Sequence, residues 1–91
     1  MQRVGDRVQV SGAMTFAGAR ALLERGSDML REGGRVFDLA AVGEVDSSGL
    51  AVVFGWSRVA AAAGQTLRIV NPPANLISLA ELYGVTELLP V

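Results

Sequence analysis

Three chemically active residue types are missing from this chain of 91 residues, which contains no cysteine, no histidine and no lysine. Without cysteine there is no disulfide, no thiolate nucleophile and no thiolate metal site. Without histidine the usual general base is absent, and without lysine Schiff-base chemistry and the phosphate-binding lysine of a P-loop are excluded. Only an all-oxygen metal site is feasible, and we expect no metal, cofactor or catalytic residue. These absences favour a small binding or regulatory domain over an enzyme.

The chain also has few aromatic residues, no large excess of either charge and no long apolar run. With three Phe, one Tyr and one Trp, the core must be built mainly from Val, Leu and Ala. The net charge of −1 offers no concentrated basic face for nucleic acid. The first ten residues carry charges, unlike a secretory signal, and no uncharged run approaches the ~20 residues of a membrane-spanning helix. We therefore expect one domain over residues 1–91, located in the cytoplasm.

The spacing of apolar residues predicts strands and helices in the order β(β)αβαβα. Strands are predicted over residues 1–4, 7–11, 36–39 and 66–70. Helices are predicted over residues 16–30, 50–63 and 74–83, and a turn capped by Thr86 would make a fourth. Thr15 is the expected N-cap of the first helix, Phe16 lies on its apolar face, and residues 40–45 are expected to be a connector. This order implies an α/β fold, with a single mixed β-sheet of about four strands backed by three or four helices.

Two interpretations are open for Asp46-Ser47-Ser48-Gly49, which lies between a predicted strand and a predicted helix. In the structural one, Asp46 or a serine caps the helix, a contact worth about 1 kcal/mol, and Gly49 permits a close backbone approach. In the functional one, Ser47 presents its hydroxyl at the positive end of the helix. Phosphorylation of Ser47 would add nearly two negative charges beside Asp46 and could eject a docked partner. No base accompanies the serine, so it is a poor nucleophile.

The helix predicted over residues 50–63 is apolar nearly all round, with Arg58 as its one charged residue. Such a helix should be buried nearly all round, which a one-sheet domain of this size can hardly achieve. We assign one stripe, containing Leu50, Val53 and Phe54, to the core. The second stripe is assigned to a partner, and its members are Val52, Trp56, Val59 and Ala63. On this interpretation Trp56→Ala leaves the fold intact and weakens binding; the alternative is that Trp56 packs under a loop or the third helix.

A resemblance to a known family covers nearly the whole chain. Phe37-Asp38-Leu39 followed by Val45-Asp46-Ser47-Ser48-Gly49-Leu50 resembles the signature of STAS domains. That fold occurs in anti-sigma factor antagonists and in the cytoplasmic tails of sulfate transporters. The more detailed similarity is to the small STAS subunit of the bacterial Mla phospholipid-transport ABC system. It rests on residues 11–16, 45–51, 68–73 and 79–90, together with Trp56.

The resemblance implies a non-enzymatic accessory subunit involved in lipid asymmetry. It would bind the cytoplasmic ATPase subunit of the ABC transporter and support its assembly and activity, reaching the membrane only through that complex. The alternative is an anti-sigma factor antagonist whose partner is a serine kinase and whose phosphorylation site is Ser47. A small-molecule-binding STAS domain ranks last.

The family's binding surface, carried over to this sequence, consists of Asp46, Ser47, Ser48 and Gly49, with the loop from Gly12 to Thr15 nearby. In the Mla-type members this surface binds the ATPase, and phosphorylation is not implied. If the stripe containing Trp56 is exposed, it could also pair two copies of the isolated chain.

Overall fold

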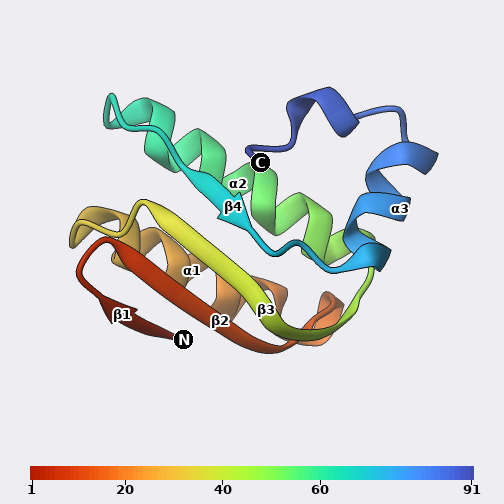
Figure 1. Cartoon of the computed structure of the whole chain (residues 1–91), viewed down its shortest axis with the longest axis horizontal. Coiled ribbons are helices and arrows are strands. Elements are labelled where there is room, and N and C mark those ends of the chain that lie inside the picture. The colour runs from red at the N-terminus through yellow and green to blue at the C-terminus, as the bar shows by residue number, and fades with distance from the viewer.

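The computed structural model describes residues 1–91, and its four strands form one mixed sheet in the order β1-β2-β3-β4 (Figure 1). The elements along the chain are β1 (Gln2–Val4), β2 (Arg7–Met14), η1 (Phe16–Gly18), α1 (Ala19–Arg31), β3 (Val36–Val45), α2 (Ser47–Ala62), β4 (Arg68–Val70), α3 (Ala74–Leu82) and η2 (Thr86–Leu88). β1 pairs antiparallel with β2, while β2, β3 and β4 run parallel. The predicted fold class and element order are confirmed.

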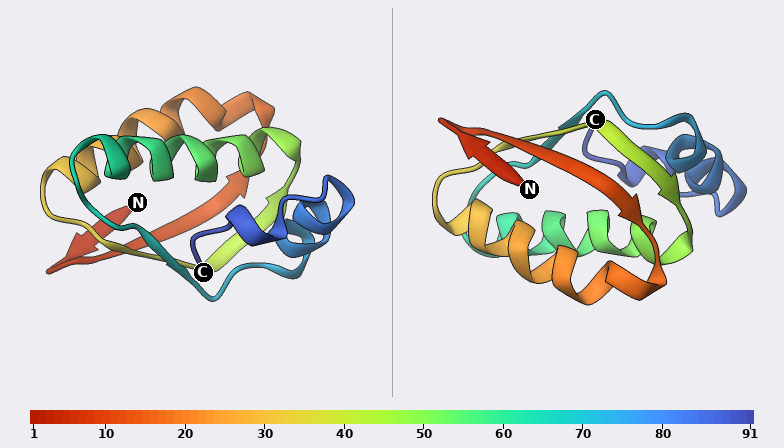
Figure 2. Two further views of the ribbon diagram at one scale, coloured as in Figure 1. Left: turned by 90° about the horizontal axis from the view of Figure 1, so that it is seen from above. Right: turned by 90° about the horizontal axis from the view of Figure 1, so that it is seen from below.

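The helices α1 and α2 lie side by side against one face of the sheet, and α3 and η2 lie beyond its end (Figure 2). Period-two alternation explains the sheet, since Val8 and Val10 are fully buried under the helices while Arg7 and Gln9 face solvent. The largest fully buried side chains are Trp56, Phe37, Met14, Leu39, Ile69, Leu76, Val8, Val10 and Val53. The opposite face of the sheet carries no helix (Figure 2).

The prediction of a connector over residues 40–45 is wrong, because β3 continues through Val45. The pairing with β2 shifts register twice, between Gln9↔Asp38 and Ser11↔Ala41 and again between Gly12↔Val42 and Met14↔Val45. Each shift inserts an extra residue on β3, as in a β-bulge. The shifts bring Val42 and Val45 back to the core face. They also break the apolar alternation, so the sequence pattern does not indicate a strand there.

The assignment of Trp56 and Val52 to an exposed partner stripe is also wrong. Trp56 is 0% exposed and Val52 5% exposed. The indole of Trp56 packs on the ring of Phe37, with centroids 4.9 Å apart, and its Nε1 donates to the carbonyl of Leu22 at 3.1 Å. A Cβ on Gly26 would overlap the indole. Because α1 covers this side of α2, the indole is enclosed between α1, α2 and the sheet.

Candidate protein-interaction site

Asp46 organises the start of α2 and the turn that precedes α1. Its Oδ1 accepts hydrogen bonds from the N–H groups of Ser48 at 2.8 Å and Gly49 at 3.3 Å, which makes it the N-cap of α2 as predicted. Its Oδ2 accepts from the N–H of Phe16 at 3.0 Å. Donation from Phe16, followed by Gly49 and Ser48, lowers the pKa of the Asp46 carboxyl. The ionised carboxylate therefore ties two segments together that lie far apart in sequence.

Gly49 is required by the close approach of α2 to the end of β2. It is buried, and a Cβ at this position would overlap the carbonyl oxygen of Met14 and lie 2.9 Å from Cγ1 of Val45. The same Met14 carbonyl accepts a hydrogen bond from the N–H of Asp46 at 3.3 Å. Packing of backbone on backbone fixes where α2 begins relative to the sheet.

Ser47 is exposed at the first position of α2 and makes no side-chain hydrogen bond in the structure. It lies at the N-terminus of a 16-residue helix, where the helix dipole is positive. Ser48 and Thr15 are half-buried beside it. The prediction that Thr15 caps the first helix is wrong, because its side chain makes no capping bond and η1 intervenes before α1. The Asp46 carboxylate satisfies the N–H of Phe16 instead.

Phe16 is the residue at this site that the sequence pattern misplaces. Its predicted position on the apolar face of the first helix would bury it, yet it is 81% exposed. The regular helix begins only at Ala19, so the three- and four-residue spacing does not extend back to Phe16. Gly18, in what would be the first helical turn, is the signal that the helix starts late. The structure thus presents an exposed phenyl ring on the segment that Asp46 joins to the start of α2.

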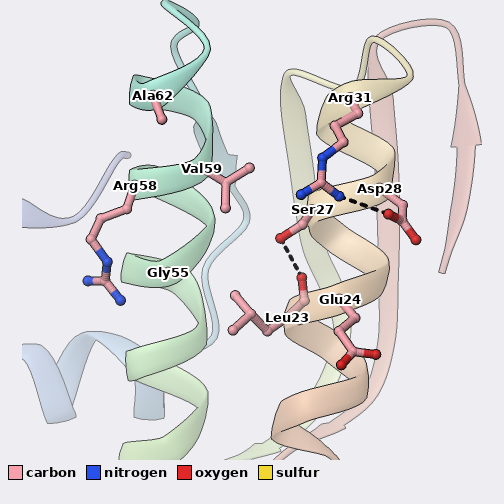
Figure 3. A pocket seen from close by; sticks show the side chains of 9 residues that line it. All are labelled: Leu23, Glu24, Ser27, Asp28, Arg31, Gly55, Arg58, Val59 and Ala62. Atoms are coloured by element: carbon pink, nitrogen blue, oxygen red, sulfur yellow. Dashed lines mark hydrogen bonds and ion pairs between the residues drawn. The ribbon is translucent and has the colours of Figure 1, made fainter.

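An open groove of about 650 Å³ lies between the surfaces of α1 and α2, farther from the start of α2 than the cluster around Ser47 (Figure 3). Leu23, Gly55 and Val59 line it, and the side chain of Arg58 turns away from α1. The α1 wall is charged, and its Asp28 and Arg31 form an ion pair at 2.9 Å. Val59 is three turns along α2 from Ser47, a separation of about 18 Å. Val59 is therefore half-buried in this groove and is not part of the cluster around Ser47.

Five of the eight predicted site residues are thus brought together in the structure: Thr15, Asp46, Ser47, Ser48 and Gly49. No group of three or more His, Cys, Asp or Glu side chains is arranged to hold a metal ion. The Ser47 hydroxyl makes no hydrogen bond to the preceding Asp46 carboxylate or to any other side chain, so no group is positioned to take its proton. The arrangement is suited to contact with another molecule through an exposed aromatic ring, an exposed hydroxyl and a helix N-terminus.

Comparisons with known proteins agree with this fold. A family model described as "Mlab, STAS domain" matches residues 1–90. Among solved structures, the chain is similar to the anti-sigma factor antagonist SpoIIAA in its unphosphorylated form, with a TM-score of 0.65 and 15% identity over 90% of this chain and 79% of that chain. At that identity the likeness shows the fold alone. No curated protein sequence matches the chain significantly. None of its helices has the length and apolar character needed to span a bilayer.

Proposed function

Because the chain belongs to the STAS family described as "Mlab, STAS domain", we propose that it is the accessory subunit of an Mla-type phospholipid-transport ABC transporter. In this role it binds the cytoplasmic ATPase subunit through the cluster around Ser47 and supports assembly and activity of the transporter. STAS domains are typically regulatory and non-enzymatic, and this proposal assigns ATP hydrolysis to the partner. The domain would be cytoplasmic and reach the membrane only within the complex.

The observation that carries this proposal is the exposed Phe16, whose backbone N–H is bound by the same Asp46 carboxylate that caps α2 next to Ser47. An exposed aromatic side chain on a rigid backbone loses little entropy on binding, which is why aromatic residues dominate interface energetics. The hydrogen bonds that the Asp46 carboxylate accepts from both segments supply that rigidity. This arrangement replaces Trp56, whose burial removes it from any docking surface.

The alternative is an anti-sigma factor antagonist controlled by phosphorylation of Ser47. The fold of SpoIIAA, described in its unphosphorylated form, supports it. So does the exposure of Ser47, which a kinase could reach without unfolding the helix. A phosphoryl group there would be attracted by the helix N-terminus and repelled by the neighbouring Asp46 carboxylate.

Binding to purified partners tests both roles. We expect the domain to form a stable complex with an Mla-type ATPase subunit in size-exclusion chromatography with light scattering. Ser47→Glu and Phe16→Ala should each weaken that complex at least tenfold by calorimetry, because both side chains lie at the cluster's surface. Ser78→Glu on α3 and Val4→Ala on β1 are the matched controls, since both residues are exposed elsewhere.

Two outcomes would overturn the transporter role. The first is capture of a serine kinase that phosphorylates Ser47, together with no measurable affinity for the ATPase; that result would establish the alternative. The second is unchanged ATPase affinity in both Ser47→Glu and Phe16→Ala, which would move the interface away from this cluster. Circular dichroism of each variant checks that the fold persists.

A further inference from the structure

A second exposed apolar surface lies at the C-terminal end of α3, which is the end away from the cluster around Ser47. Leu82 is 75% exposed, Tyr83 56% and Leu88 67%, and we refer to these three residues as the C-terminal patch. Single exposed leucines are ordinary on protein surfaces, but three large apolar side chains exposed within seven residues are a candidate interaction site. Neither the sheet nor the cluster around Ser47 makes use of these residues.

The C-terminal patch is held firmly in place. α3 ends at Leu82, and Gly84, whose φ is +68°, permits the left-handed turn that follows the helix. The N–H of Val85 then donates to the carbonyl of Ala80 at 2.9 Å. Beyond η2, Leu89 is 6% exposed, and the carbonyl of Pro90 accepts from the N–H of Ile69 in β4 at 2.6 Å. Figure 1 shows this segment leaving α3 and returning to β4. The patch therefore lies on a segment, from the end of α3 to η2, that is anchored at both ends.

The surroundings of the patch are acidic. Glu81 and Glu87 are both exposed, and the three ion pairs of the structure involve neither of them. All eight arginines occur at or before Arg68, so residues 69–91 contain two acidic side chains and no basic one. An apolar surface with unpaired carboxylates beside it favours an apolar partner that carries positive charge.

We propose that the C-terminal patch is a second docking surface, which binds a basic amphipathic helix of a partner protein. The leucines and Tyr83 would contact the apolar face of that helix, and Glu81 and Glu87 would face arginines or lysines at its edges. A second copy of this chain fits poorly, because it would bring the same carboxylates against one another. An anionic lipid surface fits poorly for the same reason.

This surface is separate from the one in the proposed function. α3 begins near the Ser47 cluster, because Nδ2 of Asn75 donates to the carbonyl of Gly43 at 3.4 Å in the last part of β3. Its nine residues then span about 13 Å before Tyr83. A variant at one surface can therefore be tested without disturbing the other.

Two synthetic helical peptides with the same leucine face test the proposal, one with arginine and one with glutamate at the polar edges. By calorimetry we expect the arginine peptide to bind at least tenfold more tightly than the glutamate peptide. Amide resonances of residues 79–91 should shift most in NMR titrations. The double variant Leu82→Ser with Leu88→Ser should reduce affinity at least tenfold. Val4→Ser, a control at an exposed apolar residue of β1, and Ser47→Glu should not change it.

A charge-reversed variant keeps the proposal falsifiable if the serine variant proves unstable. Glu81→Arg with Glu87→Arg leaves the apolar side chains in place and should invert the preference between the two peptides. The proposal fails if wild-type protein binds both peptides equally or if the shifts lie outside residues 79–91. It also fails if Leu82→Ser with Leu88→Ser abolishes self-association or binding to phosphatidylglycerol vesicles, since a second copy or a lipid surface is then the occupant.

Discussion

At the scale of single residues, Trp56 links three parts of the core. Its ring packs on Phe37 of β3, its Nε1 bonds the carbonyl of Leu22 in α1, and Gly26 provides the space for it. Trp56→Ala should therefore lower the free energy of unfolding by about 3–5 kcal/mol, a large part of the about 5–15 kcal/mol typical of a domain. Urea denaturation followed by circular dichroism measures this loss.

A second substitution tests the same contact from the other side. Gly26→Ala should also destabilise the fold, although alanine is the better helix former, because the added methyl group overlaps the indole. The buried position of the indole would be wrong if Trp56→Ala unfolded at the same urea concentration as the wild type and failed to bind the partner. Trp56 would then belong to an exposed, partner-binding stripe of α2.

At the scale of secondary-structure elements, α2 carries two glycines whose replacement should have opposite effects. At Gly49 a Cβ would overlap the backbone carbonyl of Met14, which cannot move without shifting β2. At Gly55 the nearest atom to a Cβ is Cδ1 of Leu23, 2.7 Å away at the end of a flexible side chain beside an open groove. Gly49→Ala should thus lower the thermal midpoint, whereas Gly55→Ala should leave it unchanged or raise it, with about 0.5–1 kcal/mol of helix propensity in its favour. Calorimetric melting of the pair gives the comparison, and equal destabilisation by both variants would contradict it.

The order of the elements could be predicted because each one carries a periodic pattern or an end signal of its own. Alternation at Val8 and Val10 and the cap at Asp46 are local features, and both are confirmed. The failures involve contacts between distant segments. The bond from Phe16 to Asp46 and the cover that α1 gives to Trp56 each join residues about thirty positions apart. A local pattern of apolar residues does not indicate such contacts. The sequence could therefore identify Ser47 as a site residue but could not predict that Phe16 is joined to the neighbouring Asp46.

The same limit applies to the stripe that was expected to remain exposed on α2. The presence of a single charged residue, Arg58, correctly indicated that α2 is apolar on both sides. Whether the domain could cover both sides depended on how α1 packs, and α1 packs on the Trp56 side through Gly26. The basis for expecting a homodimer through that stripe is therefore lost, and the exposed apolar residues lie instead at Phe16 and in the C-terminal patch.

At the scale of the whole molecule, the absent histidine and cysteine predict how stability depends on pH. Side chains with ordinary pKa values between about 5 and 9 are those of histidine and cysteine, and the chain contains neither. The free energy of unfolding should therefore change little across this range. Two carboxyls whose folded pKa values are depressed then dominate the acid side. The pKa of Asp38 is lowered mainly by the N–H of Ala40, followed by the side chains of Asn71 and Arg7.

The sign of the acid effect follows from those depressed values. Above the unfolded pKa of 3.8 both carboxylates are ionised in either state, and their hydrogen bonds contribute fully to stability. As the pH falls below that value the unfolded chain takes up protons first, so stability decreases until the folded carboxyls are protonated as well. Urea midpoints between pH 2.5 and 9 should be flat above about pH 5 and fall below about pH 4. Asp46→Asn and Asp38→Asn should each flatten the acid side. A step in stability between pH 6 and 8 would instead mean that some other group titrates with folding.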